Sequence, residues 1–520
     1  MAKPKVLISD KLSAAAVEIF KNNGVEVDVK VGLKPDELIS IIGEYDGLAI
    51  RSATKVTPEV IKAGKRLKVI GRAGIGVDNV DREAATAAGV IVMNTPFGNS
   101  VTTAEHSIAL MMSLARKIPQ ASESTHKGKW EKNKFEGVEL MNKTLGLIGC
   151  GNIGGIVADR AQGLKMKVVA YDPFLTPEKA KDLNIEKVTL DELLKRADFI
   201  SLHTPLNAET KNILNKDSLA KCKKGVRIVN CARGGLVNEA DLKAAIESGQ
   251  VAGAAFDVFE EEPATTNVLF GLEQVVATPH LGASTSEAQE NVALQVAEQM
   301  SDYLVNGTIT NALNMPSVSA EEAAKLKPYL SLAEVLGKFV GQMAKEIKSI
   351  KIEYSGNTAG LNTKALTSVV LKGALEEIAE GVNMVNAPAV AKERKIEVSE
   401  VKNEDAKDYT NLIRVSANGA SAAGSVLGKG QPRLVEVNEF PLEAAIGKTL
   451  LYVKNEDKPG LIGNVGTILG NNKINIANFH LGRSDTGAVA LIEVDGDISD
   501  KVLAEIAKVP TVLLAKVFRF

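Results

Sequence analysis

The sequence predicts an α/β protein in which two doubly wound parallel-sheet domains face each other across a cleft. Three observations favour this fold class. Short runs rich in Val, Ile and Leu alternate with helical patterns from the start, the alternation restarts after residue 117, and a glycine-rich turn follows the first strand of the second series. Such alternation is typical of parallel strands that are covered by helices.

The first series of strands is expected at KVLISD, VEVDV, GLAIRS, LKVIGRAG and VIVMNT. The second series is expected at TLGLIG, KVVAYD, ADFISLHT, GVRIVNCA, VAGAAFDVF and QVVATPH. Residues 281–307 then form one long helical pattern, which can return the chain to the first domain. We therefore predict a first domain from residues 1–95 and 283–315, and a second domain from residues 96–282.

The rest of the chain predicts two smaller domains. Pro316 and the small polar residues after it mark a boundary, and the block 316–447 has helical patterns before the strand-like runs KSIKIEYSG, NLIRVSANG and RLVEVNEF. This block is expected to be an α+β intervening domain. The tail, residues 448–520, has the βαββαβ order of a small ferredoxin-like module.

The composition excludes several classes of partner. A formal net charge of −2 over 520 residues, without a block of like charge, gives no electrostatic footprint for nucleic acid. No apolar stretch reaches the ~18 residues of a membrane span, and MAKPKVLISD has no features of a signal peptide. Cys150, Cys222 and Cys231 are too scattered for a disulfide framework or a zinc site. We expect a cytoplasmic protein that binds no metal.

The run GCGNIGG places Gly149, Gly151 and Gly154 in G-x-G-x-x-G spacing between a strand and a helical pattern. Gly149 permits a tight turn, Gly151 lets pyrophosphate approach the backbone, and Gly154 lets helix and strand pack closely. The next strand ends in Asp172, where an acid accepts hydrogen bonds from ribose hydroxyls and repels a 2′-phosphate. This order predicts NAD rather than NADP, and a purely structural glycine turn is the alternative.

Further cofactor contacts are expected near strand ends, because open α/β sheets bind ligands at the carboxyl ends of their strands. In addition to the three glycines and Asp172, we predict that the cofactor is bound by Asn152, Ile153, His203, Thr204, Pro205, Cys231, Ala232 and Asp257. His106, in contrast, lies within a helical pattern and is interpreted as a packing residue.

Three residues after strand ends have the chemistry of a dehydrogenase that acts on a 2-hydroxy acid. Arg233 follows the buried run GVRIV, and its planar guanidinium suits a carboxylate. His280 follows a strand and a proline, and the ordinary pKa of a histidine suits proton exchange at neutral pH. Glu262 can orient the imidazole of His280. The alternatives are a structural histidine, and an ion pair of Arg233 with Asp257 or Glu262.

The strings VRIVNCARGGLVNE, DVFEEEP and VATPHLGAST resemble the D-isomer-specific 2-hydroxyacid dehydrogenases, with Arg233, Glu262 and His280 at that family's catalytic positions. IRSATKVT, GRAGIGVDNVD and the βαββαβ tail narrow the resemblance to the long-form D-3-phosphoglycerate dehydrogenases. The resemblance implies Rossmann-like and flavodoxin-like domains. It also implies oxidation of D-3-phosphoglycerate to 3-phosphohydroxypyruvate with NAD, the first step of L-serine biosynthesis, by a homodimer or homotetramer.

The resemblance also implies residues for a substrate and an effector. The residues expected at the substrate are Arg51, Ser52, Arg72, Gly74, Ile75 and, from a neighbouring subunit, Lys132. The two arginines would bind phosphate, and the backbone N–H groups of Gly74 and Ile75 would bind carboxylate. The tail resembles an ACT domain, in which Asn455, Asp457 and Asn475 would contact L-serine. A tail that only dimerises is the alternative.

Two other functions remain open for the whole chain. A glyoxylate or hydroxypyruvate reductase would share the catalytic residues, with less need for phosphate-binding arginines and an ACT tail. An NAD-sensing corepressor would use the same fold as a binding protein, and would need a peptide-docking surface.

Overall fold

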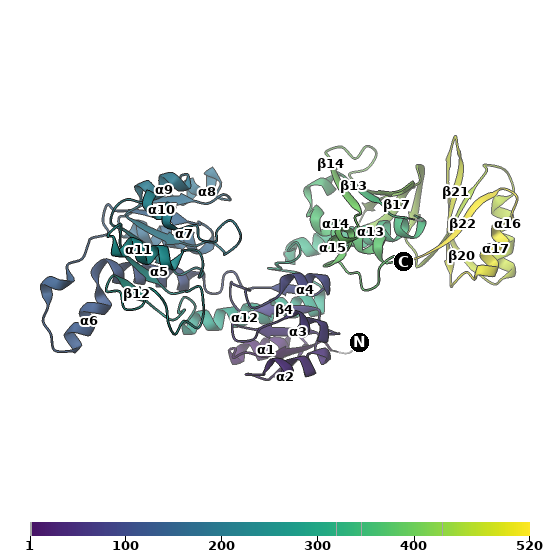
Figure 1. Ribbon diagram of the computed structural model, residues 1–520. Coiled ribbons are helices and arrows are strands. Elements are labelled where there is room, and N and C mark those ends of the chain that lie inside the picture. Colours follow the sequence, from purple (N-terminus) through teal and green to yellow (C-terminus); the bar gives the residue numbers. More distant parts are fainter. Residues whose placement is uncertain (1–2, 319, 345, 429) are drawn as a thin grey trace.

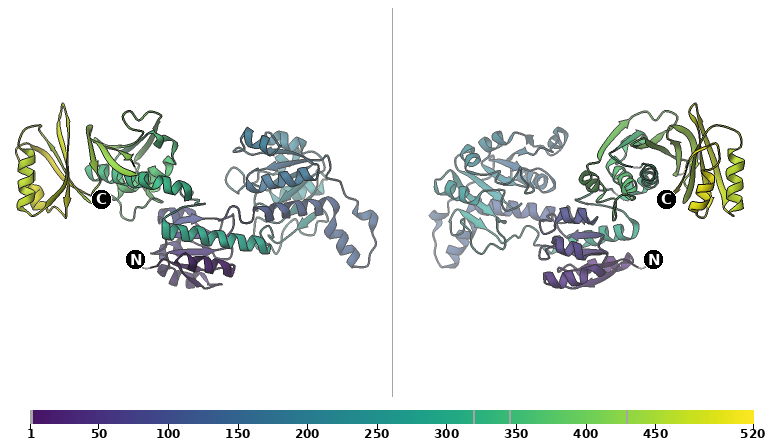
Figure 2. Two further views of the ribbon diagram at one scale, coloured as in Figure 1. Left: turned by 180° about the vertical axis from the view of Figure 1, so that it is seen from behind. Right: turned by 45° about the vertical axis from the view of Figure 1, so that its right-hand side comes forward.

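The computed structural model describes residues 3–318, 320–344, 346–428 and 430–520. It has four folded units, each built around one sheet (Figure 1). The second unit lies at one end of the molecule and the C-terminal unit at the other, and the two views of Figure 2 agree on this order. Within the described part of the chain, no helix is long and apolar enough to cross a membrane.

The first unit has a parallel sheet in the order β2-β1-β3-β4-β5. Its strands are β1 Lys5–Ile8, β2 Glu26–Val29, β3 Gly47–Ile50, β4 Val69–Arg72 and β5 Ile91–Met93. Its helices are α1 Ala14–Asn22, α2 Pro35–Ile41, η1 Ile42–Glu44, α3 Pro58–Ala63 and α4 Arg82–Ala87.

Helix α12 Ser286–Asn306 belongs to this unit although it follows the second sheet in sequence. Its Val292, Val296 and Met300 are buried in one cluster with strand residues of the first sheet. A Cβ on Gly71 of β4 would lie 2.2 Å from the Sδ of Met300, so only glycine permits this close packing. The chain therefore enters the second unit and returns from it, and the two units are joined by two crossings.

The second unit has a parallel sheet in the order β12-β11-β10-β9-β6-β7-β8. Its strands are β6 Thr144–Ile148, β7 Lys167–Tyr171, β8 Glu186–Lys187, β9 Phe199–Leu202, β10 Val226–Asn230, β11 Val251–Phe256 and β12 Val275–Ala277. Its helices are α5 Ser100–Arg116, α6 Ile118–His126, η2 Lys132–Phe135, α7 Asn152–Gly163, α8 Pro177–Asp182, α9 Leu190–Arg196, α10 Lys216–Lys221 and α11 Glu239–Glu247. The strand order reverses at β6, which places a ligand crevice at its carboxyl end.

The intervening unit has a mixed sheet in the order β14-β13-β15-β16-β17-β18. Its strands are β13 Ser349–Gly356, β14 Glu397–Asn403, β15 Asn411–Ala417, β16 Ala420–Leu427, β17 Gln431–Val437 and β18 Phe440–Ala445. Its helices are α13 Ala320–Met343, η3 Asn357–Gly360, α14 Thr363–Leu375 and α15 Ala387–Glu393.

Strands β14, β16 and β18 were not expected from the sequence. The run that forms β16 is rich in Ala, Ser and Gly rather than in large β-branched residues. Small residues occur there because helix α13 packs closely on the strand, and a Cβ on Gly424 would lie 2.4 Å from a methyl carbon of Leu332. The packing of a neighbouring helix therefore outweighs the weak strand propensity of these residues.

The C-terminal unit has the predicted βαββαβ order and an antiparallel sheet in the order β20-β21-β19-β22. Its elements are β19 Thr449–Asn455, α16 Leu461–Asn471, β20 Asn475–Ser484, β21 Gly487–Asp495, α17 Asp500–Ile506 and β22 Val512–Arg519. One face of the sheet is covered by its two helices. The other face joins the core of the intervening unit, where the rings of Phe339 and Phe518 stack with centroids 4.3 Å apart.

Candidate active site

The glycine turn after β6 has the geometry of a dinucleotide site. Gly149 has φ +93°, and a Cβ there would lie 2.5 Å from the carbonyl oxygen of His203. A Cβ on Gly154 would lie 2.4 Å from the carbonyl oxygen of Gly149, whereas one on Gly151 would meet open space. Helix α7 begins at Asn152 without a side chain that caps its first N–H groups. These N–H groups therefore suit the pyrophosphate of a dinucleotide.

Asp172 follows β7, and its side chain stabilises this turn. Its carboxylate accepts hydrogen bonds from the backbone N–H of Cys150 and of Phe174, both at 2.8 Å. The predicted contact with the ribose hydroxyls comes in addition to these two bonds and stays a prediction. The bond to Cys150 could not be predicted from the sequence, because it joins the turn to a residue 22 positions further along the chain.

Three titratable side chains of the second unit, two of them at predicted cofactor positions, are held in uncharged form. The imidazole of His203 lies beside Gly154, its Nε2 is 2.8 Å from Ser201 Oγ, and loss of solvent lowers its pKa to about 4. Burial raises the pKa of Cys150 to about 11 and that of Cys231 to about 12. Both thiols are therefore poor nucleophiles near neutral pH.

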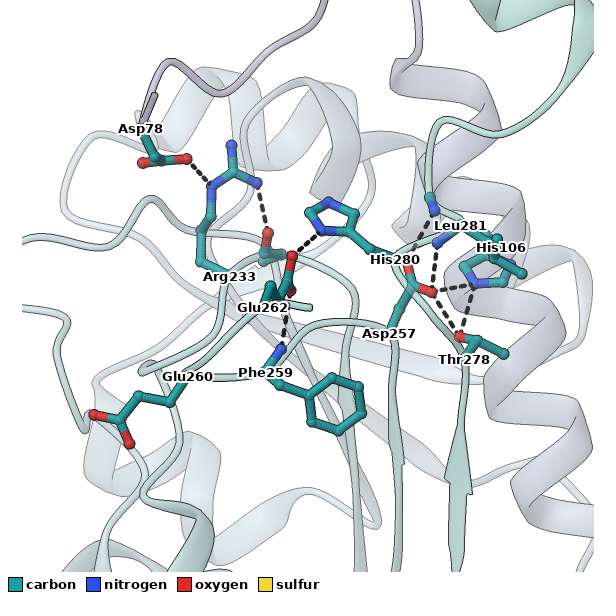
Figure 3. Close-up of polar contacts among 12 residues, drawn as sticks. Asp78, His106, Arg233, Asp257, Phe259, Glu260, Glu262, Thr278, His280 and Leu281 are labelled. Atoms are coloured by element: carbon teal, nitrogen blue, oxygen red, sulfur yellow. Dashed lines mark hydrogen bonds and ion pairs between the residues drawn. The ribbon is translucent and has the colours of Figure 1, made fainter. Parts of the chain in front are cut away.

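The predicted partners His280 and Glu262 lie together (Figure 3). The Nδ1 of His280 is 2.6 Å from Oε2 of Glu262, whose other oxygen accepts a hydrogen bond from the backbone N–H of Phe259 at 3.1 Å. Burial pushes the pKa of Glu262 up, but the hydrogen bond and charge of His280 outweigh burial and lower it. The His280 side chain is 52% exposed, so its second ring nitrogen can reach a ligand in the cleft.

Arg233 is paired with neither of the acids that the sequence suggested. Its Nε is 2.9 Å from Oδ2 of Asp78, and its Nη1 donates to the carbonyl oxygen of Ala232 at 2.6 Å. Asp78 follows β4 in the first unit, whereas Arg233 follows β10 in the second (Figure 3). The ion pair therefore crosses the cleft, and the sequence alone offered no way to recognise it.

Two arginines lie across glycines of the RAGIG turn. A Cβ on Gly74 would lie 1.5 Å from Nη1 of Arg72, and a Cβ on Gly76 would lie 1.8 Å from Nη2 of Arg233. Burial, followed by the charges of Arg233 and Arg51, lowers the pKa of Arg72 to about 10. Its Nε has no hydrogen-bond partner among the residues that the structure describes. This excess of positive charge suits a ligand with more than one anionic group.

The other predicted substrate residues differ in how well they are placed. Arg51 and Ser52 follow β3, and the backbone N–H of Arg51 donates to Asp10 Oδ2 at 2.6 Å. The N–H of Gly74 donates to Thr95 Oγ1 at 2.6 Å, so in this conformation it is not available to a carboxylate as predicted. The role of Ile75 stays a prediction.

Lys132 is not part of the cleft within one chain. It begins the short helix η2, which follows α6 in sequence, and α6 projects from the second unit on the side away from the first (Figure 1). A contact with substrate would therefore need a neighbouring subunit, as the resemblance implied.

The predicted effector residues are divided between the two ends of the C-terminal sheet. Asn455 is buried at the end of β19, where it pairs in register with Ala488, and Asp457 is 3.0 Å from Arg483. Asn475 pairs in register with Asp495 at the opposite end of β21. One chain therefore does not bring the three residues together, because β21 runs the full length of the sheet between them.

His106 is the polar residue that the sequence interpretation missed. Its Nε2 is 3.1 Å from Oδ1 of Asp257, so the residue is paired and does not serve packing alone. Asp257 is fully buried and also accepts hydrogen bonds from Thr278, Leu281 and Gly282. Its predicted cofactor contact stays a prediction. Among the described residues, no cluster of three or more His, Cys, Asp or Glu could hold a metal ion.

Models of three known domains match this chain. The NAD binding domain of the D-isomer specific 2-hydroxyacid dehydrogenases matches residues 108–282, the D-3-phosphoglycerate dehydrogenase intervening domain matches residues 325–438, and the ACT domain matches residues 449–511. The D-3-phosphoglycerate dehydrogenase of Synechocystis sp. is 44% identical over 514 residues, which cover 97% of this chain and 93% of the relative. That of Bacillus subtilis is 43% identical over 522 residues, with coverages of 98% and 99%.

The chain belongs to the D-3-phosphoglycerate dehydrogenase family. The NAD⁺-bound 3-phosphoglycerate dehydrogenase of Entamoeba histolytica has a similar structure, with a TM-score of 0.52, 32% identity, and coverage of 60% of this chain and 99% of that one. The TT0316 protein of Thermus thermophilus gives a TM-score of 0.54, 35% identity, and coverages of 58% and 97%. The predicted family and fold class are therefore confirmed.

Proposed function

We propose that this chain catalyses the NAD-dependent oxidation of D-3-phosphoglycerate to 3-phosphohydroxypyruvate, the entry step of L-serine biosynthesis. One observation supports this most directly. The His280–Glu262 pair lies near Arg233 (Figure 3), and Arg233 belongs to an arginine cluster in which the Nε of half-buried Arg72 has no described partner. Such a cluster favours a substrate that carries both a carboxylate and a phosphate.

The residues of the chain account for the proton and for the developing charge. Because Nδ1 of His280 is held by Glu262, Nε2 takes the proton of the C2 hydroxyl. The bound NAD supplies the acceptor for the hydride that leaves C2. Loss of the proton and of the hydride converts the C2 alcohol into a carbonyl, and Glu262 stabilises the imidazolium that results. Arg233 binds the carboxylate and the carbonyl oxygen.

The phosphate would be bound by Arg51 and Arg72, the arginines of the cluster that belong to the first unit. Arg51 and Arg72 come from the ends of adjacent strands, β3 and β4, and the charge of Arg51 repels that of Arg72. A phosphate would relieve this repulsion. The planar guanidinium of an arginine can donate two hydrogen bonds to a phosphate, and an unphosphorylated acid has no group to accept them. We therefore expect selectivity for the phosphorylated substrate.

The test is a comparison of kcat/KM for D-3-phosphoglycerate and for unphosphorylated 2-hydroxy acids, with NADH formation as the signal. We expect a strong preference for the phosphorylated acid, and Arg72→Gln should reduce that preference. A preference of the wild type for glyoxylate or hydroxypyruvate in the reverse direction would favour a reductase. NADH binding without turnover of any of these acids would favour a corepressor-like protein.

We also propose that the C-terminal unit binds L-serine between two copies of the chain. Strand β20 is the edge of its sheet. If β20 pairs in antiparallel fashion with β20 of a second copy, Asn475 of one copy approaches the end of the sheet that carries Asn455 in the other. The Oδ1 of Asn455 is buried without a described hydrogen-bond partner, so it can accept a hydrogen bond from a ligand.

This proposal implies a homodimer or homotetramer, and the projecting helix α6, with the 87%-exposed Trp130 that follows it, offers a second surface for assembly. A serine titration of the steady-state rate, with the mass measured in parallel, tests both parts. A rate that does not change with serine concentration would mean that the C-terminal unit serves only in assembly.

The three buried free cysteines support a reducing compartment, and we propose the cytoplasm.

A further inference from the structure

The backbone of His280 has an unusual conformation for a residue with a side chain. Its φ is +57°, in the left-handed region that L residues adopt only when the surrounding structure imposes it. Its backbone N–H donates to the carbonyl oxygen of Asp257 at 2.9 Å. The direction of the His280 side chain therefore depends on what holds this turn.

The carboxylate of Asp257 holds the turn on both sides of His280. Before it, Thr278 Oγ1 donates to Oδ1 at 2.6 Å. After it, the N–H of Leu281 donates to Oδ1 at 2.7 Å and the N–H of Gly282 donates to Oδ2 at 2.8 Å. The carboxylate must be ionised to accept all of these bonds, although it is fully buried.

His106 supports the carboxylate from helix α5 (Figure 3). Its Nε2 is 3.1 Å from Oδ1 of Asp257 and 3.4 Å from Thr278 Oγ1. An ionised carboxylate can only accept, so Nε2 must carry the donated proton. Burial pushes the pKa of Asp257 up, but the hydrogen bonds of His106, Thr278 and Leu281 outweigh burial and lower it. Among these, the bond from His106 contributes most.

We propose that His106 is a positioning residue for the reaction, which acts through Asp257 to hold His280 in its strained conformation. The assignment rests on the proposed function, because it concerns the proton transfer by His280. A second bond from the same helix supports it, since Thr103 Oγ1 donates to the carbonyl oxygen of Gly282 at 2.8 Å. Helix α5 therefore fixes both ends of the turn.

The test compares His106→Leu with His106→Gln. Leucine removes the donor, whereas glutamine places an amide N–H the same number of bonds from the backbone as Nε2. Because a misplacement of ~1 Å can reduce the rate ~10²-fold, we expect kcat of His106→Leu to fall roughly 10- to 100-fold. The KM for substrate and the NADH dissociation constant should change little, and His106→Gln should recover most of kcat.

Leu110→Ala is the matched control for loss of stability. Leu110 is buried one turn further along α5 and contributes to the apolar core rather than to the turn. We expect this variant to lower Tm without lowering kcat at temperatures well below Tm. If His106→Leu lowers Tm to a similar extent and leaves kcat unchanged, the residue serves packing alone and the proposal is overturned.

A double-mutant cycle with Asp257→Asn decides whether His106 acts through Asp257. We expect the double variant His106→Leu/Asp257→Asn to be no slower than Asp257→Asn alone. Independent, additive losses would overturn the proposed pathway.

Hydrogen exchange provides a readout that needs no substrate. The backbone amides of residues 280–282 should exchange faster in His106→Leu than in the wild type, and unchanged exchange there would contradict the proposal. This measurement stands even if the wild type fails to oxidise D-3-phosphoglycerate, in which case the proposed substrate, and not the support of the turn by His106, would be wrong.

Discussion

Replacement of Gly76 by alanine should remove Arg233 from its position without disturbing the fold. The new Cβ would lie 1.8 Å from Nη2 of Arg233. The guanidinium must move by at least about 1.6 Å to reach an ordinary contact distance of about 3.4 Å. The backbone at Gly76 does not have the positive φ that would strain an alanine, so the effect should be confined to Arg233 and to Asp78, whose Oδ2 would lie 3.0 Å from the new Cβ.

The size of the effect follows from the geometry of carboxylate binding. A displacement of ~1 Å at a reacting centre can reduce the rate ~10²-fold, which corresponds to about 2.7 kcal/mol. The displacement here is larger, and it would also break the bond between Nε and Asp78 at 2.9 Å. We therefore expect kcat/KM to fall by about 10²- to 10³-fold.

The assay is the steady-state kcat/KM for D-3-phosphoglycerate, with Tm measured on the same preparations. Gly163→Ala is the matched control, because a Cβ at this position, in the last turn of α7, would meet open space. We expect the control to keep the wild-type kcat/KM. If Gly76→Ala keeps the wild-type value and folds normally, Arg233 does not need the position that the structure gives it, and the catalytic account would have to be revised.

Three further predictions concern the rest of the site. His280→Ala should lower kcat by about 10²- to 10⁴-fold with a smaller change in KM, because proton transfer is lost; an unchanged kcat would exclude His280 as the base. Asp172→Ala should shift the ratio of kcat/KM values from NAD toward NADP and weaken cofactor binding, since the bond to the N–H of Cys150 is also lost; unaltered NAD selectivity would show that other residues discriminate. The pKa of His203 is lowered from 6.5 to about 4 in the folded state, so the unfolded chain binds more protons and stability falls as the pH falls from 6.5 to 4. His203→Gln should reduce this loss by at most about 3 kcal/mol in urea unfolding at pH 4 relative to pH 7, and an identical pH dependence would contradict the desolvated state of the imidazole.

The parts of the site that the sequence predicted are those determined by local pattern. Gly149, Asp172 and His280 each follow an apolar strand, and the carboxyl ends of parallel strands meet at one edge of a sheet. Their common place at the carboxyl edge of one sheet therefore follows from the strand pattern alone. The same reasoning applies to the C-terminal unit, where the order of elements was correct.

The parts that were missed depend on contacts between distant elements. Asp78 meets Arg233 only because two separately folded sheets face each other, and no spacing in the chain records that contact. His106 was assigned to packing because the positions around it on α5, such as Leu110 and Met111, are apolar. A histidine among buried apolar residues needs a hydrogen-bond partner, and this need could have indicated a polar role for His106. The division of the effector residues between two ends of a sheet likewise depends on strand pairing, which places Asn475 beside Asp495.

The ion pair across the cleft is too weak to close it unaided. The side chain of Asp78 is 73% exposed and that of Arg233 is 28% exposed, and pairs of this kind are worth about 0–1 kcal/mol. The pKa of Arg72 is lowered first by burial and then by the charge of Arg233, and the repulsion between these two arginines opposes closure at the same place. An anion that binds arginines from both units removes the repulsion and adds charge-assisted hydrogen bonds to each of them. The substrate should therefore hold the two units together far more strongly than Asp78 does.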